Sequence, residues 1–144
     1  MATAVRVLVA VVFFSLALQF ILDLARNYKS LPQKTACHFN AKGIADGWES
    51  PRDWAVMSVC AVVFSAALAI LMLLRLDTGS GVMDIVAQIA PCLGFGIVYP
   101  AFTQILRINT GRQKRLSISR VFAWGLATPV VVFLAVMAPI TLRR

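Results

Sequence analysis

The chain has 144 residues, 60% of them hydrophobic, and a mean hydropathy of +0.81. Because soluble domains contain roughly 45–50% apolar residues, this composition excludes an ordinary soluble domain. The net charge of +8, from 14 Lys and Arg against 6 Asp and Glu, comes without a motif that reads DNA or RNA. We therefore assign the charge to contact with anionic lipid headgroups and expect no nucleic-acid partner.

Four apolar blocks are each long enough to cross a bilayer, and they lie at about residues 5–25, 54–75, 82–106 and 120–142. So much chain inside lipid leaves no room for a separate soluble domain. The sequence predicts an all-α membrane protein, with four transmembrane helices in a bundle and a turn-rich polar loop between the first two helices, at residues 26–53. Residues 1–144 would then form a single polytopic domain.

The first block is too long for the apolar core of a signal peptide, and no small-residue cleavage site follows it. We therefore expect it to remain in the mature protein as a transmembrane helix. Gln19 and Asp23, near its end, are four residues apart and share one helix face. Because polar side chains are costly in lipid, this face is expected to point into the bundle or toward the membrane interface.

The polar loop carries several turn signals. Leu31–Pro32 predicts an extended or turn conformation before the proline. Asn40–Gly43 and Asp46–Gly47 both predict turns, because glycine allows positive φ. Ser50 and Pro51 are typical of the N-cap and first position of a helix. The loop is therefore expected to be a series of turns that leads into the second helix.

The second block begins at Trp54, which is predicted to be an interfacial anchor. The third block is the least regular, because polar residues and helix breakers interrupt it: Asp84, Gln88, Pro91, Gly94, Gly96, Pro100 and Gln104. The prolines predict a kink or local unwinding, and the glycines allow close helix approach. Intramembrane polar residues in a broken span are typical of a transporter site, but packing against small residues is the interpretation we favour.

A basic connection, RINTGRQKRLSISR, joins the last two blocks at residues 107–120. Its Asn109–Gly111 segment predicts a turn, and Ser119 is predicted to cap the last helix. Arg112, Lys114 and Arg115 form a cationic cluster at headgroup depth. Contact with anionic lipid is the favoured interpretation of this cluster, and docking of an acidic partner is the alternative.

Four spans would place both termini on one side of the membrane. The two polar loops, at residues 26–53 and 107–120, hold ten Lys and Arg residues, against four on the other side. By the positive-inside rule, this distribution predicts that both polar loops face the cytoplasm.

Residues 31–48 follow the pattern LP-x5-HFN-x2-G-x2-DGW. This pattern resembles the domain of unknown function at the N-terminal side of SdpI-type bacterial immunity proteins and their relatives. The matching residues are Leu31, Pro32, His38, Phe39, Asn40, Gly43, Asp46, Gly47 and Trp48. The chain departs from the family in having Thr35 and Ala36 where a second proline usually stands, and in lacking the second membrane domain of the longer immunity proteins.

The resemblance implies a small multi-pass protein of the bacterial inner (cytoplasmic) membrane. Immunity members of the family resist a secreted peptide toxin and hold a repressor at the membrane, so a peptide toxin or another membrane protein is the implied partner. The resemblance also implies that the motif loop faces outside the cytoplasm. The cation count predicts the opposite, and the orientation stays open.

Three interpretations of the motif residues compete. In the first, His38, Asn40 and Asp46 hydrogen-bond the loop backbone, and Trp48 holds the loop on the interface. In the second, the loop presents a rigid surface to a peptide or membrane protein, with Phe39 and Trp48 as anchors. In the third, His38 with Asp46, Glu49 or Asp53 binds a divalent metal or forms an acid–base pair, and His38 and Asp46 would be the polar site of a membrane enzyme or small transporter. For the motif residues themselves we favour the first interpretation, which is compatible with the second. The sequence has a single histidine and no catalytic motif, so we assign no catalytic residue, metal or cofactor. For the protein's function we therefore favour a recognition, immunity or sensor role.

Overall fold

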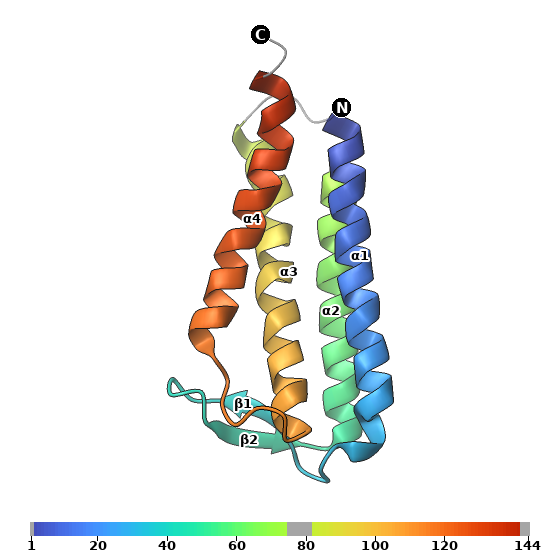
Figure 1. Cartoon of the computed structure of the whole chain (residues 1–144), viewed down its shortest axis with the longest axis vertical. Coiled ribbons are helices and arrows are strands. Elements are labelled where there is room, and N and C mark those ends of the chain that lie inside the picture. The colour runs from blue at the N-terminus through green and yellow to red at the C-terminus, as the bar shows by residue number, and fades with distance from the viewer. Residues whose placement is uncertain (1, 75–81, 142–144) are drawn as a thin grey trace.

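The computed structural model describes residues 2–74 and 82–141 (Figure 1). In chain order the elements are α1 (Ala2–Asn27), the 3-10 turn η1 (Tyr28–Ser30), β1 (Thr35–Phe39), β2 (Ala45–Glu49), α2 (Pro51–Leu74), α3 (Val82–Asn109) and α4 (Ile118–Thr141). Each helix begins and ends within three residues of a predicted apolar block. The connection between the second and third apolar blocks and the C-terminal Arg143 and Arg144 lie outside the described residues.

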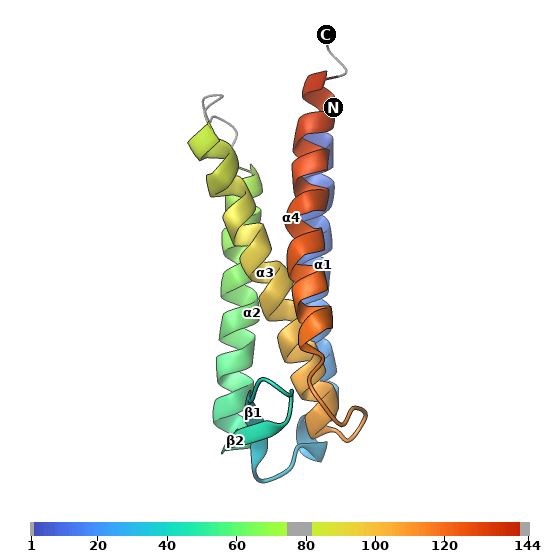
Figure 2. The same cartoon turned by 90° about the vertical axis from the view of Figure 1, so that its left-hand side faces the viewer.

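The four long helices run side by side along the molecule, and the two strands lie across one end of them (Figures 1 and 2). α1 packs against α2 and α4, and α3 packs against the same two helices. The start of α1 and the end of α4 lie at the opposite end from the strands (Figure 1). The two polar connections, α1 to α2 and α3 to α4, are therefore gathered at a single end of the helices.

Apolar side chains cover the outside of the helices. Among the described residues, three helical stretches are long and apolar enough to cross a membrane, over Arg6–Ser30, Pro51–Leu74 and Ile89–Asn109, and a shorter apolar stretch covers Ile118–Leu134 of α4. Phe64, Leu71 and Leu126 are 72%, 67% and 65% exposed. So much apolar surface is a liability in water but suits contact with lipid chains. The chain is a multi-pass membrane protein.

The core lies between the inward faces of the helices. Phe13 and Phe95 join α1 to α3 with ring centroids 4.8 Å apart, and Phe20 meets Phe102 at 6.4 Å. Trp54 lies 6.5 Å from Phe102 and is fully buried. The prediction of Trp54 as an interfacial anchor was therefore wrong, because its ring packs inside the hydrophobic core and does not face the headgroups.

The polar loop is more regular than predicted. Its middle forms the two-stranded antiparallel hairpin β1–β2, so the all-α prediction described the helices but missed the strands. Asn40–Gly43 is a turn, as predicted, whereas Asp46–Gly47 lies inside β2, where strand pairing replaces the turn that its composition favours. Ser50 caps α2 as predicted, because its Oγ accepts a hydrogen bond of 3.1 Å from the Asp53 N–H.

The predicted cap of α4 was wrong, and Gln19 does not take one of its two predicted orientations. α4 already begins at Ile118, so Ser119 lies in its first turn and is not its N-cap. Gln19 is exposed on α1, so it does not point into the bundle, and the alternative of a position toward the membrane interface stays a prediction. Asp23 is half-exposed near the end of α1 and pairs with Arg26 at 3.6 Å, which agrees with the alternative of a position toward the membrane interface.

α3 remains helical through both Pro91 and Pro100, so the predicted local unwinding does not occur. Its glycines differ. A Cβ on Gly96 would lie 2.5 Å from Thr128 Oγ1 and 3.2 Å from the Trp124 carbonyl oxygen, whereas a Cβ on Gly94 would meet nothing within 4 Å. The close approach of α3 and α4 therefore depends on Gly96 and not on Gly94. The side chains of Asp84 and Gln88 lie outside the described part of the structure.

This difference predicts opposite effects for two matched substitutions. Alanine in place of glycine within an open helix stabilises it by roughly 0.5–1 kcal/mol, so Gly94→Ala should raise the thermal unfolding temperature in detergent or leave it unchanged. Gly96→Ala should lower it, because overpacking typically costs about 1–3 kcal/mol. Equal unfolding temperatures for the two variants would contradict the packing described for Gly96.

Candidate functional site: the β1–β2 hairpin

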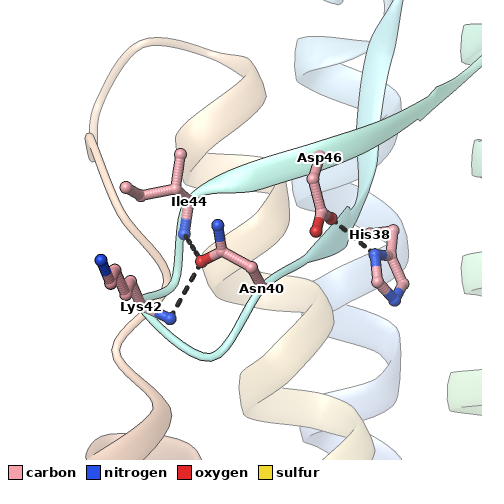
Figure 3. A network of polar contacts seen from close by, with 5 residues as sticks. All are labelled: His38, Asn40, Lys42, Ile44 and Asp46. Atoms are coloured by element: carbon pink, nitrogen blue, oxygen red, sulfur yellow. Dashed lines mark hydrogen bonds and ion pairs between the residues drawn. The ribbon is translucent and has the colours of Figure 1, made fainter.

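The turn of the hairpin is specified by Asn40 and Gly43. The Asn40 Oδ1 accepts hydrogen bonds from the Lys42 N–H at 2.9 Å and the Ile44 N–H at 3.1 Å (Figure 3). The Gly43 N–H donates to the Asn40 carbonyl at 2.8 Å, and Gly43 has a φ of 71°. An asparagine that bonds the backbone ahead of it, followed by a glycine at positive φ, suits a short hairpin connection.

His38 and Asp46 face each other across the two strands. Nδ1 of His38 lies 2.5 Å from Oδ1 of Asp46 (Figure 3), and the two side chains are 74% and 42% exposed. Gly47 is the strand partner of His38, and a Cβ on Gly47 would lie 2.7 Å from the His38 Cβ. The motif glycine therefore leaves room for the histidine, and the histidine–aspartate pair lies at the surface.

The inner face of the hairpin packs on the helices. Thr35 is fully buried, and its hydroxyl donates to the Pro32 carbonyl at 3.1 Å. Cys37 and Phe39 are partly buried against the hydrophobic core. Phe39 therefore lies on the inner, structural face of the hairpin. The second interpretation of the sequence placed Phe39 and Trp48 on one recognition surface, and the structure does not bring them together there.

Asn109, the last residue of α3, holds the outer edge of β1. Its Oδ1 accepts a hydrogen bond from the Ala36 N–H at 2.8 Å, and its Nδ2 donates to the Ala36 carbonyl at 3.0 Å. The side-chain amide thus pairs with both backbone groups of one residue, as a neighbouring strand would. The sequence assigned Asn109 only to a turn, because nothing local points to a partner 73 residues away.

A second contact holds the tip of the hairpin against the connection between α3 and α4. The Leu116 N–H donates to the Gly43 carbonyl at 2.9 Å. A Cβ on Gly43 would lie 2.1 Å from the Leu116 carbonyl oxygen. Gly43 is therefore required twice, once for its positive φ and once for the close approach of the two backbones.

Side-chain amides hold that connection in place. Oε1 of Gln104 accepts from the Ser117 N–H at 2.8 Å and from Nε2 of Gln113 at 3.0 Å. Gln104, which the sequence placed among the intramembrane polar residues, is thus a buried support near the end of α3. In the predicted cationic cluster, Arg112 donates to Oδ1 of Asn27 at 3.1 Å, and all three basic side chains are exposed.

The outer face of the hairpin remains uncovered. Ile44 and Trp48 are 43% and 55% exposed, and they share the hairpin with the exposed His38 and Asp46. Within the residues that the structure describes, no three His, Cys, Asp or Glu side chains gather in a group that could hold a metal ion. The arrangement offers a hydrogen-bonding pair beside apolar side chains on a supported surface.

Comparison with known proteins gives one family for this region. The family described as "Domain of unknown function (DUF1648)" matches residues 14–64. This stretch runs from the middle of α1 to the middle of α2 and contains the whole hairpin. No curated protein and no solved structure matches the chain.

The two glycines at positive φ provide a matched test of the tip contact. Gly43 and Gly111 have φ of 71° and 74°, but a Cβ on Gly111 would meet nothing within 4 Å. Gly111→Ala should lower the free energy of unfolding by about 1–2 kcal/mol, because its left-handed backbone alone is strained. Gly43→Ala should lower it further, because Leu116 must also move.

Hydrogen exchange separates the two variants. The Leu116 amide should exchange faster in Gly43→Ala than in the wild type, and it should keep its protection in Gly111→Ala. Unchanged protection in Gly43→Ala would show that the tip contact does not fix the hairpin.

The thiol of Cys37 gives a pH-dependent prediction. Burial, together with the Glu49 carboxylate, raises the pKa of Cys37 above its ordinary value. Because Glu49→Gln removes a charge that opposes the thiolate, the variant should lower the pKa and speed alkylation of Cys37 at neutral pH. The measurement is the rate of iodoacetamide labelling against pH, followed on the Cys37 peptide by mass spectrometry. A profile that does not move toward lower pH in the variant would contradict the assigned role of Glu49.

Proposed function

We propose that this multi-pass membrane protein recognises a peptide or another membrane protein through the outer face of its hairpin. The observation that carries the proposal is the contrast between the two faces. Asn109 and Leu116 hold the edge of β1 and the tip of the hairpin, whereas His38, Asp46 and Trp48 lie exposed on the outer face. A fixed surface with an exposed aromatic ring and a polar pair suits recognition, because little conformational freedom is lost on binding.

Stability alone explains the outer residues poorly. Exposed ion pairs contribute roughly 0–1 kcal/mol, and Trp48 leaves more than half of its surface uncovered. The first interpretation of the motif therefore suits Asn40 and Gly43, which build the turn. It suits His38 and Trp48 less well.

An immunity or sensor role is the more specific form of this proposal. Its support is the likeness of residues 31–48 to SdpI-type immunity proteins, and the match of residues 14–64 to a domain of unknown function is compatible with it. In that role the ligand is a peptide toxin or a membrane protein, and the protein resides in the bacterial inner membrane. The alternative is a membrane enzyme or small transporter that uses His38 and Asp46 as its polar site.

The recognition surface also needs a fixed position at the membrane. We place α4 as the fourth span of a bundle, because its 24 residues extend for about 36 Å and a bilayer core is roughly 30 Å thick. The hairpin would then lie at the headgroup level, where both polar connections meet.

Photocrosslinking in native membranes tests the proposal. Trp48 is replaced by the photoreactive residue p-benzoylphenylalanine, and Leu126, which is also exposed, is replaced in the same way as a lipid-facing control. We expect a discrete polypeptide adduct from position 48 only. Adding His38→Ala and Asp46→Asn should reduce this adduct severalfold while protein abundance and thermal stability stay at wild-type levels.

Two outcomes would contradict the proposal. Loss of abundance in the double substitution would assign the pair to folding. Adducts confined to lipid at both positions would show that the outer face meets no polypeptide partner.

A further inference from the structure

Two adjoining cavities lie between α1, α3 and α4, away from the hairpin's outer face. The first has a volume of about 340 Å³ and the second about 290 Å³. Four residues line both cavities: Leu16, Tyr99, Pro100 and Trp124. The two cavities therefore adjoin along these four residues, and we call them the two sections of one groove.

The first section is apolar and opens toward lipid. Its walls include Val12 and Phe13 of α1, Phe95 of α3, and Val131 of α4. Val12 and Val131 are 46% and 59% exposed, so the section is a surface groove and not a closed core cavity. A groove of this composition, on the face of a membrane helix, suits a hydrocarbon chain.

The second section is polar and cationic. Arg107 comes from the last turn of α3 and Arg120 from the first turn of α4, and both line the section. The ion pairs among the described side chains join Asp23 to Arg26 and His38 to Asp46, so neither arginine has a carboxylate partner there. Gln104 and Gln113 add amide groups to the same wall.

Trp124 marks the boundary between the two sections. It lines both of them and is 55% exposed. Tryptophan is enriched at the level where lipid headgroups meet hydrocarbon. The order along the groove, from apolar walls through Trp124 to two arginines, therefore matches the order along a phospholipid molecule.

We propose that this groove binds one anionic phospholipid, with an acyl chain along the apolar section and the phosphate between Arg107 and Arg120. Two guanidinium groups without a carboxylate partner among the described side chains favour a headgroup with net negative charge, because a zwitterionic headgroup carries its own positive charge and leaves none of its negative charge for the arginines. The site is separate from the exposed cluster of Arg112, Lys114 and Arg115, which lines neither section of the groove.

Lipid retention by the purified, delipidated protein tests the proposal. Phosphatidylglycerol or phosphatidylethanolamine is added back in detergent, and bound lipid is counted by native mass spectrometry. We expect one tightly held phosphatidylglycerol and at least a tenfold weaker retention of phosphatidylethanolamine. Arg107→Gln with Arg120→Gln should abolish the preference, whereas Lys114→Gln with Arg115→Gln, which removes the same charge elsewhere, should keep it.

Each alternative has its own outcome. Equal loss of binding in both double variants would overturn the site in favour of diffuse attraction to the basic connection. Inorganic phosphate or a short-chain phosphatidylglycerol that competes as well as the long-chain lipid would remove the role of the apolar section. Equal retention of the two lipids by the wild type would remove the charge selection. A protein dimer that covers α1 and α4 and excludes lipid would replace the lipid with a second copy of the chain.

Discussion

The bonds between the Asn109 side chain and the backbone of Ala36 are the constraint on which the hairpin depends. A two-stranded hairpin is marginally stable at best on its own, and its outer strand edges offer unpaired backbone groups. Asn109 pairs the N–H and the carbonyl of one residue on that edge and does so from the end of a long helix. The position of β1 is thereby fixed by α3, an element far from it in sequence.

The two faces of the hairpin follow from this attachment. Once β1 is held against α3, Thr35, Cys37 and Phe39 turn toward the helices. Ala36 is also buried, so His38 is the exposed residue of β1. His38 is then exposed whatever its role, and Gly47 opposite it has to remain small. The motif residues are thus divided by geometry into those that build the hairpin and those that the hairpin displays.

The sequence predicted those features that depend on neighbouring residues. The apolar blocks, the Asn40–Gly43 turn and the Ser50 cap are local, and each is found in the structure. The prediction of a turn at Asp46–Gly47 was wrong, because cross-strand pairing outweighs the local turn preference of these two residues.

Contacts between distant segments could not be predicted in the same way. Asn109 with Ala36 and Leu116 with Gly43 join residues 73 positions apart in each case, and no periodicity or spacing records such a pair. An amide side chain at the end of an apolar helix was the available signal. Such a side chain indicates that its amide must find hydrogen-bond partners, but the sequence does not show which residues these are.

The hairpin and the groove share one physical support. Gln104 and Gln113 line the polar section of the groove and also hold the connection between α3 and α4. That connection reaches the hairpin tip through Leu116, one residue before the Ser117 that Gln104 holds. Lipid in the groove and a partner on the hairpin can each favour one position of this connection. In that case each ligand changes the affinity of the protein for the other by the same factor, because linkage between two binding sites is reciprocal. The strength of that linkage depends on how far residues 113–117 shift, and the buried Gln104 amide is the group that restrains them.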